Sequence, residues 1–171
     1  TAAGAKGANV TVWTREVSDA LVAAQYYTSV LNNIGLNAKL TTLPRATYYT
    51  TIGNRNTKAQ TGWARWLEDY PHPLDWFDVL LNGNRIVDQN NNNYAYYSNK
   101  KVNSQIESLK KAPVLTPAVN ARWAGVEQTI MKDAPWAPWS NRVFPEFFSK
   151  KMGCIHVQLL YGIDLTRLCK K

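Results

Sequence analysis

NVTVWTREVSDALVAAQYYTSVLNNIGLNAKLTT, residues 9–42, is the stretch of sequence that decides the fold. Its first residues, 9–13, alternate apolar and polar side chains, which is typical of a β-strand. Apolar residues then recur at helical spacing from Glu16 to Ile34, and Gly35 stands where the left-handed cap of a helix is expected. The alternation returns over residues 36–42. The stretch therefore predicts strand, helix and strand, with a right-handed crossover if the strands are parallel.

Three further helices are predicted by capping residues and apolar spacing. Each start combines a residue that favours a helix N-terminus with apolar positions three or four residues apart. The predicted starts are Pro73, Ser98 with Asn99, and Thr116 with Pro117, and a short helix ending at Gly53 precedes them.

The segments around these helices are predicted to be extended chain or loop. Residues 60–66 look extended, and residues 82–98, which include four consecutive asparagines, look too polar to pack and suit a long surface loop. Closing strands are expected at Val143–Phe148 and Cys154–Leu160, with a short element at 164–168. The predicted class is α/β, a mixed sheet flanked by helices, without internal repeats.

Length and composition suit one domain over residues 1–171. The chain has 171 residues, 45% of them hydrophobic, and no apolar run approaches the roughly 20 residues of a membrane helix. No targeting signal opens the chain. Because it starts without Met and runs straight into a strand pattern, we expect it to be a piece of a longer protein.

The net charge of +8 does not by itself indicate a nucleic-acid partner. Lysines occur as scattered pairs near the ends of predicted elements, where they are solvated and complement helix C-termini. They form no basic stripe interleaved with aromatic rings, so we expect no nucleic-acid partner. The pairs are at 100–101, 110–111, 150–151 and 170–171.

The sequence gives little material for catalysis or metal binding. With only two histidines, a histidine-rich metal site is excluded, and no cofactor motif is present. His72 with Asp69, Asp75 and Asp78 is the best acid–base cluster, but no known catalytic motif surrounds it. We therefore predict that the protein is not an enzyme.

The two cysteines, Cys154 and Cys169, lack the spacing of metal ligands. In an exported protein they can form a disulfide, whereas in a cytosolic protein they would be buried thiols. Cys154 and His156 invite a nucleophile and base interpretation, but no third orienting group is visible, so a disulfide or core role is favoured.

Seven tryptophans and nine tyrosines suit a binding cleft, because flat aromatic rings pack against ligands at a low desolvation cost. We expect about half of them to be core residues, Trp123 and Trp136 among them. The cleft candidates are Trp63, Trp66, Trp76, Tyr94, Tyr96 and Tyr97.

Four short stretches are similar, in this order, to runs of one protein family. LNNIGLNA (31–38) matches L-x-x-I-G-I-x-V, WLEDYPHP (66–73) matches W-x-x-D-Y-P-D-P, YSNKKV (97–102) matches Y-S-N-P-x-V, and DAPWAP (133–138) matches D-A-P-W-I-P. On these matches the chain resembles the C-terminal lobe of the family 5 extracellular solute-binding proteins. This family includes the oligopeptide- and dipeptide-binding proteins of ABC importers.

The resemblance implies a fold of two hinged lobes that close on a peptide or other small solute and deliver it to the importer's membrane subunits. It implies an extracytoplasmic place, at the cell surface or in the periplasm, with an anchor and a second lobe in the N-terminal part. By match, Asp69 pairs with the α-ammonium group of the ligand and Trp66 lies near it. Trp63, Tyr70 and His72 complete the expected contacts.

Two departures and three alternatives accompany the resemblance. His72 replaces the family's second acidic residue and Lys100 replaces a proline, so the ligand is left open. Asp69 has an alternative role in capping the helix begun at Pro73, or in binding loop amides. The other functional hypotheses are a carbohydrate- or cell-wall-binding module and a hydrolase that uses His72 and Asp69.

Overall fold

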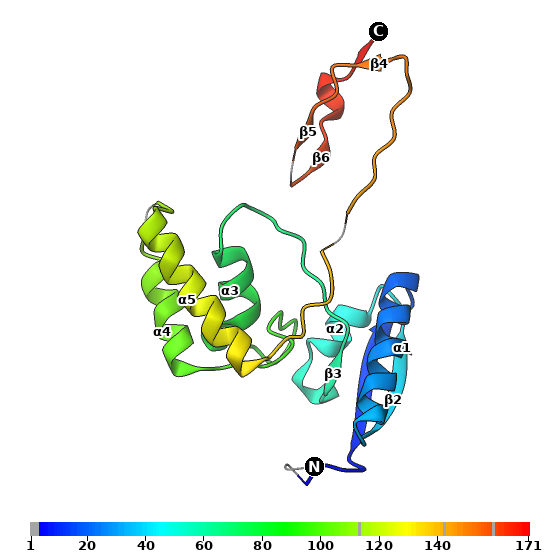
Figure 1. Cartoon of the computed structure of the whole chain (residues 1–171), viewed down its shortest axis with the longest axis vertical. Helices are drawn as coiled ribbons and strands as arrows, with labels where there is room; N and C mark the ends of the chain where they lie inside the picture. Colours follow the sequence, from blue (N-terminus) through cyan, green and yellow to red (C-terminus); the bar gives the residue numbers. More distant parts are fainter. Residues whose placement is uncertain (1–3, 113, 142, 159) are drawn as a thin grey trace.

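The computed structural model describes residues 4–112, 114–141, 143–158 and 160–171. It has two packed units and an extended C-terminal segment (Figure 1). The elements are β1 (Asn9–Arg15), α1 (Ser18–Asn33), β2 (Asn37–Leu43), α2 (Tyr48–Ile52), a 3₁₀ turn (Arg55–Thr57), β3 (Thr61–Gly62), α3 (Leu74–Leu81), a 3₁₀ turn (Gly83–Arg85), α4 (Lys100–Leu109), α5 (Pro117–Asp133), β4 (Met152–Gly153), β5 (Val157–Gln158), β6 (Gly162–Ile163), a 3₁₀ turn (Leu165–Arg167) and β7 (Cys169–Lys170).

The predicted strand, helix and strand are confirmed and build a parallel sheet of order β2-β1-β3. Helix α1 ends as the glycine pattern predicts. Gly35 has a φ of +95°, its N–H donates to the Asn32 carbonyl, and the Leu36 N–H donates to the Leu31 carbonyl. These two bonds form a Schellman cap, which turns the chain back along the sheet.

The core of this α/β unit lies between α1 and the sheet. Val12 at the centre of β1 is fully buried and packs with Ala24 and Leu31 of α1 and Ala38 of β2. Small alanines on the inner face let the helix lie close to the strands, which favours tight packing. The expected α/β class is confirmed, and among the described residues antiparallel pairing occurs in two small ribbons near the C-terminus.

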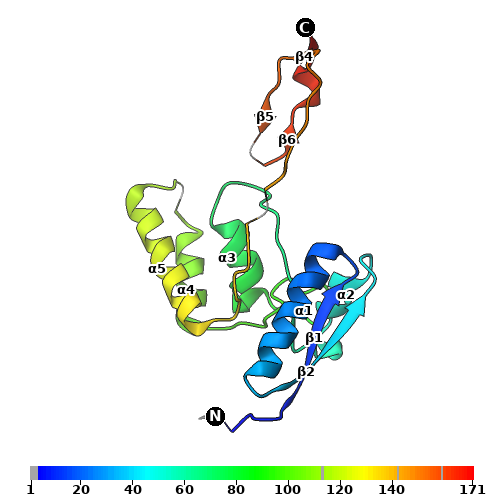
Figure 2. The same ribbon diagram turned by 45° about the vertical axis from the view of Figure 1, so that its right-hand side comes forward.

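A second unit consists of α3, α4 and α5, which lie beside the α/β unit in both views (Figures 1 and 2). The predicted caps are confirmed, because Asn99 accepts the amides of Lys101 and Val102, and Thr116 accepts the amide of Val119. The core of this helical unit contains Leu80, Leu81, Val102, Ile106, Leu109, Trp123, Val126 and Ile130.

The prediction that residues 82–98 are too polar to pack is wrong. Asn82, Asn91 and Asn93 are buried. The Asn93 side chain donates to the Tyr97 carbonyl at 2.8 Å and accepts the Tyr97 amide at 3.0 Å, so it pairs with the backbone as a strand would. An asparagine carries both a donor and acceptors, and a buried loop can therefore be satisfied without a sheet.

The C-terminal arm, residues 136–171, runs away from both units over most of its length (Figure 1). The strand predicted at Val143–Phe148 is wrong, since no strand occurs among the described residues of that stretch, and only Val157–Gln158 is a strand within Cys154–Leu160. Leu159 lies outside the described residues. Apolar runs predict strands, but a strand also needs a partner, and Phe147 remains 91% exposed.

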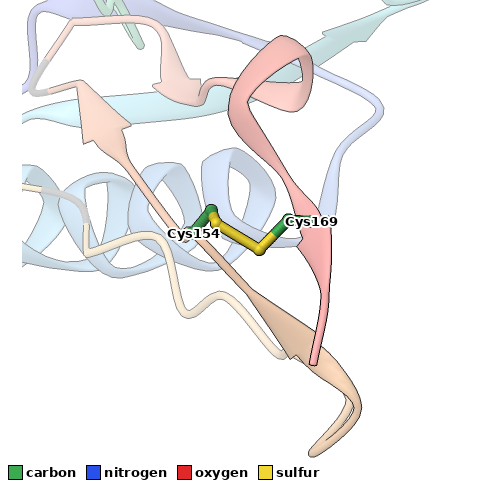
Figure 3. Close-up of a disulfide and its surroundings, with 2 residues drawn as sticks. All are labelled: Cys154 and Cys169. Carbon is green, nitrogen blue, oxygen red and sulfur yellow. A yellow bond between two sulfur atoms is a disulfide. The ribbon is translucent and has the colours of Figure 1, made fainter.

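Cys154 and Cys169 are joined by a disulfide, with their Cα atoms 5.4 Å apart (Figure 3). The bond closes the end of the arm, where β5 pairs with β6 and β4 pairs with β7. Such a closed segment has fewer conformations when unfolded, which stabilises its folded form. Among the described residues, no helix is long and apolar enough to span a bilayer.

Asp133 ties together two of the motif stretches quoted above. Its carboxylate accepts hydrogen bonds from the Tyr97 hydroxyl at 2.6 Å and from the side-chain amide of Asn99 at 2.8 Å, so the C-terminus of α5 is held to the start of α4. These two hydrogen bonds lower the pKa of Asp133, the Tyr97 bond most. Burial and then the same bond raise the pKa of Tyr97.

We expect Asp133→Asn to lower the melting temperature at pH 7, because the amide binds the two donors less well than the carboxylate. The pKa of Asp133 is lower folded than unfolded, so its contribution is fully present above the unfolded pKa and is lost as pH falls through the folded value. Thermal unfolding followed by circular dichroism should therefore show that the difference in melting temperature between the parent protein and Asp133→Asn becomes smaller in acid. A difference that stays constant down to pH 2 would contradict this assignment.

Candidate ligand-binding site

The segment that joins the sheet to the helical unit, residues 63–73, contains the five residues expected to contact the ligand, Trp63, Trp66, Asp69, Tyr70 and His72. Trp63 follows β3, and its amide donates to the carbonyl of Trp13 in β1 at 2.8 Å. Trp13 lies two residues before the end of β1 and Trp63 directly follows β3, so both are near the carboxyl edge of the sheet, where open α/β sheets bind ligands. Tyr48 of α2 fixes this edge, since its hydroxyl lies 3.0 Å from the Trp13 carbonyl and 2.6 Å from the Trp63 carbonyl.

The turn before α3 is held by its own side chains. We call residues 69–73 the Asp69 turn. Within it, the Asp69 amide donates to the Asp75 carboxylate at 2.8 Å, and the Leu74 amide donates to Nδ1 of His72 at 3.1 Å. The His72 amide donates to the Tyr70 carbonyl at 2.8 Å. Pro71 and Pro73 have no amide hydrogen to satisfy, so the backbone of the turn is firmly defined.

These bonds show which side chains satisfy the two amides that Asp69 was alternatively expected to bind. The free amide at the start of α3 is taken by His72, and the loop amide is taken by Asp75. The Asp69 carboxylate does neither, and among the described residues no hydrogen bond or ion pair engages it. The side chain is exposed. Its charge is therefore free to meet a group from outside the chain.

His72 acts within the turn. Its half-buried ring meets Trp123 edge-on, with centroids 6.2 Å apart, and Trp123 stacks on Phe77 in the core. Because Nδ1 accepts an amide hydrogen, that nitrogen is not available as a base. No carboxylate hydrogen-bonds to His72 among the described residues, so the geometry that the hydrolase hypothesis requires is not present there.

Negative charge surrounds the turn. Partial burial raises the pKa of Tyr70, and the charges of Asp75, Asp78 and Asp69 raise it further. Arg85 and Lys110 neutralise Asp78 at 3.2 and 3.3 Å, while in the described parts of the chain no cation lies within ion-pair distance of Asp75 or Asp69. The region therefore favours a cationic group over an anionic one.

Most of the aromatic residues considered for a cleft pack against other parts of the chain. Trp66 is half-buried against the helical core, as is Trp136, and Trp123 is buried as predicted. The three tyrosines expected in a cleft pack internally: Tyr94 on Tyr49 with centroids 5.5 Å apart, Tyr96 under Arg55 at 5.5 Å, and Tyr97 on the helical core. Trp76 keeps an exposed edge. The segment thus offers Trp63 and Trp66 at one end and the Asp69 turn at the other.

Sequence reasoning missed Arg15, the last residue of β1. It is 5% exposed, its guanidinium lies 6.0 Å from the centre of the Tyr49 ring, and its buried Nε has no hydrogen-bond partner among the described residues. An arginine with an unsatisfied nitrogen at the carboxyl edge of a sheet can bind an anion. The available signal was its position directly after an alternating strand, where ligands approach.

Two shallow hollows lie elsewhere, and no tryptophan lines either of them. One, of about 340 Å³, is lined by residues of the arm between Gln158 and Leu165, and the other, of about 300 Å³, by residues between Val79 and Asn92. Neither is the aromatic groove that a self-contained carbohydrate module needs. No group of three potential metal ligands occurs among the residues that the structure describes.

No protein-family model and no curated protein sequence matches the chain. Solved structures do share its fold. An oligopeptide-binding protein of clavulanic acid biosynthesis matches 96% of this chain with a TM-score of 0.87 and 19% identity. A dipeptide-binding protein from a Pseudoalteromonas species, in complex with Met-Leu, matches 97% with a TM-score of 0.73 and 20% identity.

The Helicobacter pylori periplasmic binding protein DppA, in complex with the peptide STSA, matches 76% of this chain with a TM-score of 0.66 and 19% identity. The chain spans only 31%, 33% and 25% of these three proteins, in the order given. The fold is therefore that of about a third of a peptide-binding protein, and at these identities the likeness concerns the fold alone.

We expect His72→Ala to destabilise the chain by about 1 kcal/mol, because the Leu74 amide loses its acceptor at the start of α3. His72→Asp should lose less, since a short carboxylate two residues before that amide is also a good acceptor. Urea unfolding of the two variants and the parent protein measures the difference. Equal stabilities for the alanine and aspartate variants would show that His72 does not act as the cap.

Proposed function

We propose that this chain is one lobe of a substrate-binding component of an ABC importer, and that it captures peptides or peptide-like solutes in a cleft between two lobes. In this proposal the chain is the C-terminal lobe of a family 5 type solute-binding protein and has no enzymatic role. The fold supports the proposal, because the solved structures that share it are peptide-binding proteins.

The observation that carries the proposal is the unused carboxylate of Asp69. Asp75 and His72 hold the turn, so the Asp69 side chain is not needed for that purpose. The carboxylate stays exposed, and the nearby carboxylate of Asp75 has no cation within ion-pair distance among the described residues. When a second lobe excludes water, its bond to an α-ammonium group strengthens, as charge-assisted hydrogen bonds do at low dielectric.

Arg15 adds the opposite charge that a peptide requires. A peptide is a zwitterion, and its carboxylate needs a cation at the cleft wall. The guanidinium of Arg15 is already desolvated and held over Tyr49, and its Nε is unsatisfied among the described residues. Its planar donors suit a carboxylate. Asp69 and Arg15 therefore form the two charged contacts of the proposed ligand.

The disulfide supports an extracytoplasmic location. Bonds such as Cys154–Cys169 persist mainly in oxidising compartments. We propose that the whole protein works at the cell surface or in the periplasm, anchored through its N-terminal part, and passes its ligand to the membrane subunits of the importer.

The isolated chain should bind peptides weakly or undetectably, because the contacts and the water exclusion of the other wall are missing. A two-lobed protein that contains this chain should carry a peptide or another amine-bearing solute through purification. Mass spectrometry of the small molecules that it releases identifies the ligand. Asp69→Ala should weaken its binding about tenfold to hundredfold, the effect of losing one charge-assisted hydrogen bond.

Two results would contradict the proposal. The first is micromolar binding of a peptide to the 171-residue chain alone in calorimetry. The second is a ligand that remains bound with unchanged affinity in the Asp69→Ala protein. Glu127→Ala, which removes an exposed carboxylate on α5 outside the 63–73 segment, is the control for general damage to the fold.

A further inference from the structure

One hydrogen bond links the C-terminal arm to the proposed ligand site. The hydroxyl of Tyr161 donates to the backbone carbonyl of Asp69 at 3.1 Å. Both ribbon views place the tip of the β5–β6 hairpin beside the loop that precedes α3 (Figures 1 and 2). The two residues are 92 positions apart in sequence, so only the path of the arm brings them together.

The end of the arm is built to present Tyr161. The residue stands at the turn of the β5–β6 hairpin, directly before Gly162, whose φ of +75° is a conformation that favours glycine. The Asp164 amide donates to the His156 carbonyl at 2.9 Å and closes the hairpin base. The Cys154–Cys169 disulfide encloses the whole hairpin.

Packing does not explain the position of Tyr161. Its side chain is 74% exposed, so burial of the ring contributes little to its conformation. The specific contact that it makes is the bond to Asp69. Both backbone groups of Asp69 are therefore hydrogen-bonded, because its amide donates to Asp75 and its carbonyl accepts the Tyr161 hydroxyl. The backbone on both sides of the Asp69 Cα is thereby restrained.

We propose that Tyr161 is a positioning residue, which orients the Asp69 carboxylate from the disulfide-closed end of the arm. This inference rests on the proposed function of Asp69 as the partner of a ligand ammonium group. A backbone fixed on both sides limits the directions in which the carboxylate can point, and less conformational freedom is then lost when the ligand binds. This orientation strengthens the binding of the ligand's amine and does not affect the binding of the ligand's side chains.

The first test needs no ligand and uses the 171-residue protein. Tyr161→Phe removes only the hydroxyl, and Tyr26→Phe is the matched control, because Tyr26 is also exposed and packs on Trp139 of the arm. We expect Tyr161→Phe to shift the amide resonances of Asp69 and Tyr70 and to speed their hydrogen exchange, and Tyr26→Phe to change neither. Unchanged resonances at 69 and 70 in Tyr161→Phe would overturn the positioning role.

The second test uses the two-lobed protein and compares a peptide with the same peptide acetylated at its N-terminus. Tyr161→Phe should weaken the free-amine peptide about threefold to tenfold, the loss expected for one neutral hydrogen bond, and leave the acetylated peptide unaffected. Equal weakening of both peptides would mean that Tyr161 supports the fold in general and would overturn the inference.

The two tests separate this inference from the proposed function. If the parent two-lobed protein binds neither peptide, the proposed function fails, while the resonances of Asp69 and Tyr70 still report whether Tyr161 holds the turn. Reduction of the disulfide provides an independent variant. Reduction of the parent chain should reproduce the resonance shifts of Tyr161→Phe. Reduction of the Tyr161→Phe protein should add no further shift at Asp69 and Tyr70. Large additional shifts in the reduced variant would show that the disulfide does not act on the turn through Tyr161.

Discussion

The hydrogen bond from the Asp69 amide to the Asp75 carboxylate is the interaction on which the candidate site depends. Asp75 is 1% exposed, and a buried carboxylate is costly unless it is hydrogen-bonded. Its position in the first turn of α3 also lets the helix dipole favour its charge. Because Asp75 and His72 satisfy the turn, Asp69 keeps a fixed backbone and a free side chain. A binding residue needs both properties, since a loose anchor loses affinity to conformational entropy.

The same division between structural and available groups recurs around the site. Asn93 pairs with the backbone of Tyr97, and Asp133 holds Tyr97 and Asn99, so these polar side chains are committed to the fold. Arg15 differs from them, because it is buried at the carboxyl edge of the sheet with an unsatisfied nitrogen among the described residues. His72 is committed to the fold as well, because its imidazole nitrogen accepts the Leu74 amide.

The sequence predicted the parts whose determinants are local. Residues 9–42 carry a complete pattern of strand, helix, glycine cap and strand, and the caps at Asn99 and Thr116 need only neighbouring amides. The predictions for residues 82–98 and for the arm were wrong because both segments depend on distant partners. Asparagine side chains supply these partners within residues 82–98, whereas Phe147 pairs with no strand among the described residues and remains exposed. The ligand-binding role of Asp69 was inferred from resemblance alone and stays a prediction. Arg15 was missed because its burial is set by tertiary packing.

The account rests most directly on the claim that Asp75, and not Asp69, holds the turn. Equilibrium unfolding of Asp75→Ala and Asp69→Ala in urea measures this difference within one protein. The account predicts that Asp75→Ala lowers the free energy of unfolding by about 2 to 3 kcal/mol, because the Asp69 amide loses its hydrogen bond to a charged acceptor. Asp69→Ala should change the free energy of unfolding by less than about 0.5 kcal/mol, as for an ordinary surface residue. A loss in Asp69→Ala equal to that in Asp75→Ala would show that Asp69 serves the fold, and would contradict its role as a ligand anchor.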